Sequence, residues 1–92
     1  MNMNEVVVNF SPFYTYEDKE VCNLHIEDRT DPLVYARFEL RLPSLEVIES
    51  GRMNPASQNE IINFIKEHFA TINSLKERYQ GYSLILGDIC KG

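Results

Sequence analysis

The hydrophobic period of this chain changes once, and that change limits the folds it can adopt. Over residues 34–42, apolar side chains alternate with polar ones, which is the period of a strand with one buried side and one solvent-facing side. Over residues 55–80, apolar residues recur three or four positions apart, as in an amphipathic helix. Strands followed by one helix predict an α+β domain, in which the helix covers one face of an antiparallel sheet.

Two further segments have the composition of strands, and a third is a candidate. Residues 5–10 contain three consecutive valines and end at a Ser-Pro turn signal. Residues 21–28 alternate between apolar and polar side chains like a half-buried antiparallel strand. Residues 45–48 can resume extended structure after the break at Pro43. We therefore expect a small antiparallel sheet of three to four strands.

The connecting segments are less regular. The charged residues 17–20 predict a solvated loop, which could be the tip of a hairpin, because burying four charged side chains would be costly. Near the C-terminal end, residues 82–86 can lie back as a short strand, and residues 87–92 read as a loose tail.

The start and end of the expected helix are marked by local signals. Asn54 before Pro55 is a cap followed by a first-turn proline, and residues 57–60 have the Ser-x-x-Glu spacing of a capping box. Gly81 lies just beyond the other end, where a glycine commonly terminates a helix. We expect one long amphipathic helix, with a bend near residues 73–74 because its length exceeds the height of a small sheet.

Size and charge narrow the class of protein. Ninety-two residues, 43% of them hydrophobic, predict a single domain over residues 1–92 that folds alone. Nine Lys and Arg against 14 Asp and Glu give a net charge of −5, which argues against bulk binding of nucleic acid or anionic membranes. A positively charged protein would suit this chain as a partner.

The two cysteines and the start of the chain predict a reduced, cytoplasmic protein. The opening residues lack the basic and apolar segments of a signal peptide, and no apolar run approaches the roughly 18 residues that cross a bilayer. Cys22 and Cys90 could be bridged only if the C-terminal segment lies beside the strand of Cys22, so we expect two buried or idle thiols.

The polar side of the sheet holds the first candidate site. Tyr35, Arg37 and Arg41 share this side, and together they could bind a carboxylate or a phosphate with bidentate hydrogen bonds. The alternative, which we prefer, is an ordinary solvated face on which the arginines and Glu39 pair with Glu27 across the strands.

His25 and Glu27 form the second candidate site, two residues apart on one strand face. A hydrolase or nuclease could use His25 as acid or base, Glu27 to orient it, and Arg37 or Arg41 to stabilise developing negative charge. Two side chains are too few for a metal, and the scattered glycines form no phosphate-binding loop. We expect no metal and no cofactor.

Residues 23–81 show a looser pattern that spans the whole strand-to-helix order. It runs through an Asn-Leu-His-Ile segment at Asn23, an Ala-Arg-Phe segment at 36–38, the helix start at 57–61 and Tyr79-x-Gly81. This order resembles a family of small bacterial domains of unknown function encoded near toxin–antitoxin-like genes. The resemblance implies an α+β fold and a small regulatory partner protein, and it carries over no catalytic residues.

These observations favour a protein-interaction or regulatory module, with the hydrolase or nuclease as the alternative. A homodimer is a further hypothesis, with contacts at a sheet edge formed by residues 6–8 and at the aromatic residues Phe13, Tyr14 and Tyr16. Its alternative is a monomer in which the aromatic side chains fold back over the end of the sheet and residues 82–86 cover Val7.

Overall fold

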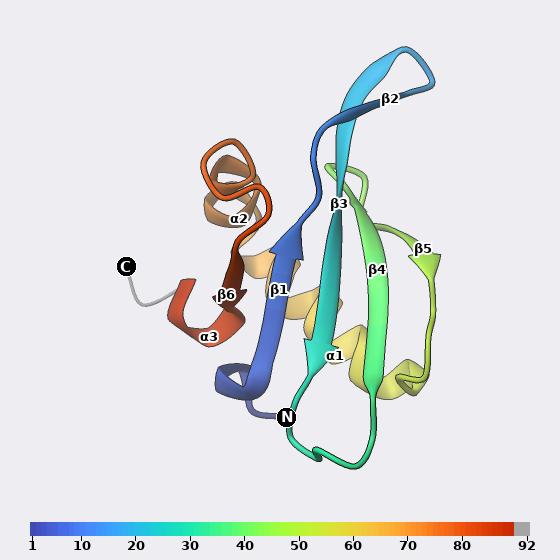
Figure 1. The fold of residues 1–92 in the computed structure, drawn as a ribbon, viewed down its shortest axis with the longest axis vertical. Helices are drawn as coiled ribbons and strands as arrows, with labels where there is room; N and C mark the ends of the chain where they lie inside the picture. Colours follow the sequence, from blue (N-terminus) through green and yellow to red (C-terminus); the bar gives the residue numbers. More distant parts are fainter. Residues whose placement is uncertain (90–92) are drawn as a thin grey trace.

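The computed structural model describes residues 1–89 and shows an α+β fold built on one antiparallel sheet (Figure 1). Among these residues it contains a short 3-10 helix at Met3–Glu5, six strands and three α-helices. The strands are β1 (Val6–Phe10), β2 (Tyr14–Tyr16), β3 (Lys19–Asp28), β4 (Ala36–Leu42), β5 (Glu46–Glu49) and β6 (Ser83–Ile85), and the helices are α1 (Pro55–Glu67), α2 (Phe69–Leu75) and α3 (Leu86–Ile89).

The strands are arranged in the order β5-β4-β3-β1-β6, and β2 pairs with the outer part of β3. In Figure 1 the β2–β3 hairpin projects beyond the other strands. Its tip is formed by Glu17 and Asp18, both with positive φ as a tight two-residue hairpin turn requires. The expectation of a charged hairpin tip in this segment is confirmed.

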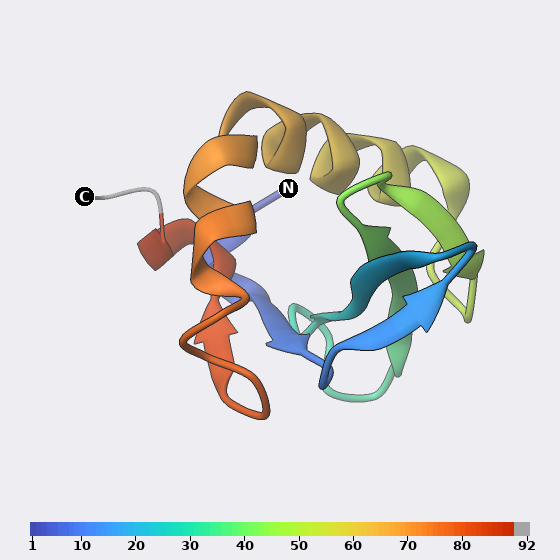
Figure 2. The same ribbon diagram turned by 90° about the horizontal axis from the view of Figure 1, so that it is seen from above.

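The hydrophobic core lies between one face of the sheet and helices α1 and α2. Figure 2 shows both helices along this side, with no helix of residues 1–89 on the opposite side. The core follows the predicted two-residue and 3.6-residue periods, and its fully buried members include Phe10, Leu24, Ile26, Phe38, Leu40, Ile61, Ile65 and Ile72. Cys22 is also buried there as a free thiol, and burial raises its pKa. Cys90 lies outside the described residues.

The expected sheet of three to four strands under one long helix is wrong. The sheet has six strands, because β2 extends the β3 hairpin and β6 adds a strand beside β1. The expected helix is divided at His68, whose φ of −116° and ψ of 25° leave the helical region. The chain turns there, so that α1 and α2 follow the sheet at different angles instead of running past it in one line (Figure 2).

The ends of the helical region are also partly as predicted. Asn54 caps α1, because its Oδ1 accepts a hydrogen bond of 2.8 Å from the amide of Ser57, with Pro55 in the first turn. Helix α2 ends at Leu75, earlier than expected, and it continues through residues 73–74 without the predicted bend. The part of the expected loose tail that is described forms α3, whose Leu86 is fully buried.

The placement of β1 corrects the proposed dimer contact. The valine strand lies between β3 and β6, so its backbone is paired on both sides and residues 6–8 form no sheet edge. Val7 pairs with Ile85 of β6, which is the alternative arrangement in which residues 82–86 cover it. The free edges of the sheet belong to β5 and β6.

Candidate interaction site on the open face of the sheet

The polar side chains of the open face are arranged in rows that cross the strands. One row joins Asn9, His25 and Glu39, and the next joins Val7, Glu27 and Arg37. A third row joins Asn23 and Arg41. All of the predicted site residues within β3 and β4 therefore share this face, as their two-residue spacing indicated.

His25 lies between two carboxylates. Its Nδ1 is 3.2 Å from Oε1 of Glu39, and its Nε2 is 3.4 Å from Oε1 of Glu27. All three side chains are partly buried. Each ring nitrogen of His25 therefore has a carboxylate oxygen as its neighbour.

Glu27 is the most connected side chain of the face. It accepts hydrogen bonds from Nε of Arg29 at 3.1 Å and from the hydroxyl of Tyr35 at 3.0 Å, besides its contact with His25. Burial raises the pKa of Glu27, but the hydrogen bonds from Tyr35, Arg29 and His25 outweigh it and leave this pKa below the ordinary value. The same hydrogen bond to Glu27 raises the pKa of Tyr35. Glu27 thus pairs with His25, Arg29 and Tyr35, whereas the preferred interpretation expected Arg37, Glu39 and Arg41 to pair with it.

The guanidinium of Arg41 already has partners within the chain. It is only 9% exposed, and its guanidinium lies 3.7 Å from the centre of the Tyr16 ring. Its Nη1 donates to Glu46 at 2.8 Å, and its Nε donates to the hydroxyl of Tyr14 at 3.2 Å. The aromatic side chains of β2 therefore fold over this end of the sheet, as one of the two alternatives expected.

Arg37 points elsewhere. Its Nη2 is 3.6 Å from Glu49 of β5, and its guanidinium lies 5.3 Å from the ring of Tyr35. Tyr35 and Arg37 are thus neighbours, whereas the third predicted binding residue, Arg41, has its own partners under the hairpin.

The hydrolase or nuclease hypothesis requires the arginines to converge on His25. A hollow of about 180 Å³ lies beside His25 and Glu27, and Arg29 lines it together with residues of β1 and Ser83. Neither Arg37 nor Arg41 is among the residues that line it. The geometry thus supports the pair His25 and Glu27 but not the charge-stabilising role assigned to the two arginines.

No group of three or more His, Cys, Asp or Glu side chains within residues 1–89 could hold a metal ion. None of the helices in this part of the chain has the length and apolar character needed to cross a bilayer.

Sequence reasoning missed Leu33 and Val34 as site residues, and both lie beside the predicted Tyr35 at the turn between β3 and β4. Val34 was assigned to the strand, but β4 begins at Ala36, and the preceding residues form a projecting tip. Leu33 is 93% exposed and Tyr35 is 54% exposed. We call residues 31–35 the apolar tip. Asp31-Pro32 marks a turn in the sequence, but the two-residue period that includes Val34 did not show where this turn ends.

A comparison with protein families, with curated proteins and with solved structures finds no match to this chain. The resemblance of residues 23–81 to the small bacterial family therefore rests on the sequence pattern alone.

Proposed function

We propose that this chain is a small cytoplasmic protein-interaction module that docks a partner protein through the apolar tip and the adjoining end of the open sheet face. The observation that carries this proposal is the exposure of Leu33, next to the exposed side chains of Val34 and Tyr35. Three consecutive exposed apolar side chains at a loop tip cost solubility unless a partner covers them, and such clusters are typical of docking sites.

Hydrogen bonds within the loop brace the tip. Oδ1 of Asp31 accepts a hydrogen bond of 2.9 Å from the amide of Leu33, and the carbonyl of Asp31 accepts one of 3.1 Å from the amide of Val34. Asp28 fixes the start of the loop through its hydrogen bonds to Thr30. A turn fixed in this way loses less conformational entropy on binding than a mobile loop would.

The surroundings of the tip favour a basic partner. A hollow of about 410 Å³ beside it is lined by Glu27, Asp28, Asp31 and Arg29 together with apolar residues of the tip. Three carboxylates and one guanidinium give this hollow a negative charge, the same sign as the net charge of −5 of the whole chain. Electrostatic complementarity would speed association with a positively charged protein such as a toxin-like enzyme, the partner that the family resemblance implies.

The test is affinity capture from native lysate at low salt, with the tip and another exposed apolar residue as a matched pair. The wild-type chain should capture a basic protein, Leu33→Asp should lose it, and Val47→Asp, on the far strand β5, should retain it. Val47 is a suitable control because it is also exposed, at 38%. Captured protein should be released as salt rises, because screening weakens the attraction.

Two results would contradict the proposal. One is the capture of no partner by the wild-type chain at low salt. The other is equal capture by Leu33→Asp and the wild type, which would place the docking surface elsewhere. Far-ultraviolet circular dichroism of both variants checks that the fold is unchanged.

A further inference from the structure

Strand β6 ends the sheet, and within residues 1–89 no strand pairs with the outer side of its backbone. On the other side of β1, the amide of Ser11 donates to the carbonyl of Asn23 at 2.9 Å, which sets the ladder between β1 and β3. In an antiparallel ladder successive residues direct their backbone groups to alternate sides. Odd-numbered residues of β1 therefore bond to β3, and Val8 bonds to β6 through its partner Leu84.

The same alternation applies within β6. Because Leu84 directs its backbone groups toward β1, the residues on either side of it direct theirs toward the open edge. These groups are the amides of Ser83 and Ile85 and the carbonyl of Ser83. No charged side chain lies within this three-residue strand, and Ile85 is 41% exposed. An edge of this kind can pair with another strand.

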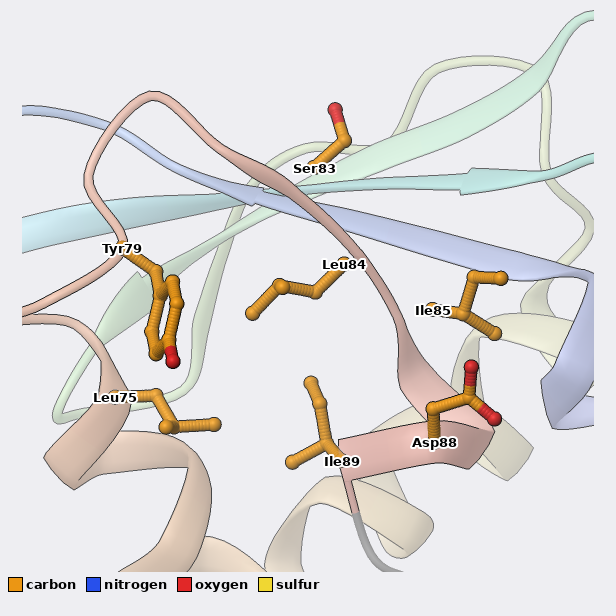
Figure 3. A pocket seen from close by; sticks show the side chains of 7 residues that line it. All are labelled: Leu75, Tyr79, Ser83, Leu84, Ile85, Asp88 and Ile89. Atoms are coloured by element: carbon orange, nitrogen blue, oxygen red, sulfur yellow. The ribbon is translucent and has the colours of Figure 1, made fainter.

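A cleft of about 440 Å³ opens beside the same edge (Figure 3). Figure 3 shows Leu84 pointing into the space between Tyr79, Leu75 and Ile89, while Ser83 points to the other side of the strand. Among the described residues that line the cleft, Asp88 alone carries a charge. The hydrophobic layer between sheet and helices is therefore open at this end of the sheet.

We propose that β6 pairs with β6 of a second copy of this chain, in an antiparallel arrangement whose two-fold axis passes between the two Leu84 residues. Ser83 would then lie opposite Ile85 of the second copy, and Ile85 opposite its Ser83. The groups that face the open edge then allow the amide of Ile85 in each copy to donate to the carbonyl of Ser83 in the other, without a change of register. The two Leu84 residues would form the non-hydrogen-bonded pair between them.

Symmetry is the argument for a second copy as the occupant. A two-fold axis perpendicular to the sheet keeps the helices of both copies on the same side of the joined sheet. The cleft of one copy then faces the cleft of the other, so a single operation pairs both edges and covers both sets of apolar side chains. The edge strand and its cleft are thus complementary to themselves, which is the requirement for an isologous interface.

This surface is separate from the apolar tip, and the two proposals respond oppositely to salt. Each copy carries a net charge of −5, so two copies repel each other and added salt should tighten their association. Added salt should instead weaken the binding of a basic partner at the apolar tip. If one of the two associations does not occur, the salt dependence of the other can still be measured.

The experiment is sedimentation equilibrium of the purified chain from micromolar to millimolar concentration, at low and high salt. We expect a reversible dimer that tightens at high salt. Ile85→Lys should raise its dissociation constant by about a hundredfold, because the symmetric interface contains the substitution twice. Ile48→Lys is the matched control, since Ile48 is 36% exposed on the opposite edge strand, and it should leave the dissociation constant unchanged.

Three outcomes would overturn the proposal. The first is a single-chain mass over the whole concentration range at high salt. The second is a dimer that Ile85→Lys leaves intact, and the third is a dimer that Ile48→Lys weakens as strongly. Thermal unfolding of both variants, followed by circular dichroism, separates loss of the dimer from loss of the fold.

Discussion

The two edges of this sheet are built differently. On β5, Glu46 and Glu49 pair with arginines of β4, and the register between the two strands shifts next to Glu39. On β6, no charge and no such shift interrupts the pairing with β1. Charged side chains and bulges are devices that keep edge strands from pairing with other chains. The difference indicates that β5 is protected from association, whereas β6 is left able to pair.

The largest difference in stability between the two edges is expected when a buried side chain next to β6 is truncated. Leu86 follows β6 directly and is fully buried, whereas Val47 on β5 is 38% exposed. Leu86→Ala should lower the free energy of unfolding by about 3 kcal/mol, through lost burial and the cavity left behind. Val47→Ala should lower it by less than about 1 kcal/mol. Urea unfolding of both variants measures the difference, and equal losses would show that the β6 edge is not anchored by the core.

Glycines near the two edges allow a second test. Gly51 precedes α1 with a φ of +56°, and a Cβ there would collide with the backbone carbonyl of Arg37. Gly81 precedes β6 with a φ of +82°, but a Cβ there would meet no atom within 4 Å. Gly51→Ala should therefore cost about 2 to 3 kcal/mol, and Gly81→Ala only about 1 kcal/mol of backbone strain. Thermal unfolding gives both values, and a larger loss at Gly81 would contradict this assignment.

The strands with one buried side could be predicted because their two-residue period can be recognised from residues that are neighbours in the sequence. Strand β1 starts one residue later than the predicted range 5–10, and β3 and β4 differ from the predicted ranges only at their ends. Strand β2 has three residues, too few to show a period, and it exists because the hairpin pairs it with β3. Its aromatic side chains cover Arg41 through that pairing, so the sequence period placed Arg41 on the correct face but could not show its burial.

The helix break at His68 could not be predicted from the hydrophobic period, for a different reason. Apolar residues continue through His68 at helical spacing, so the sequence on either side of the break has the same pattern. The break reflects how α1 and α2 pack on a curved sheet, which depends on strands far away in the chain (Figure 2). The apolar tip was missed for a similar reason, because Val34 fits the strand period, yet pairing with β3 starts at Ala36.

The smallest effect is expected within β5 itself, where two glutamates differ in the burial of their arginine partners. Glu49 is 3.6 Å from Arg37, and both side chains are substantially exposed, so Glu49→Gln should change the free energy of unfolding by less than about 0.5 kcal/mol. Glu46 is 2.8 Å from Arg41, whose side chain is 11% exposed although that of Glu46 is 60% exposed, so Glu46→Gln should cost more than Glu49→Gln, about 1 kcal/mol, because a charge-assisted hydrogen bond is weakened.

Urea unfolding at low and at high salt checks both values. The loss for Glu49→Gln should shrink further as salt rises, since exposed pairs are screened, while the loss for Glu46→Gln should persist. Equal losses at the two positions would mean that the arginine under Tyr16 gains nothing from its burial. A persistent loss at Glu46 alone would show that one ion pair of β5 anchors the strand to the sheet, while the other serves only to keep the edge charged.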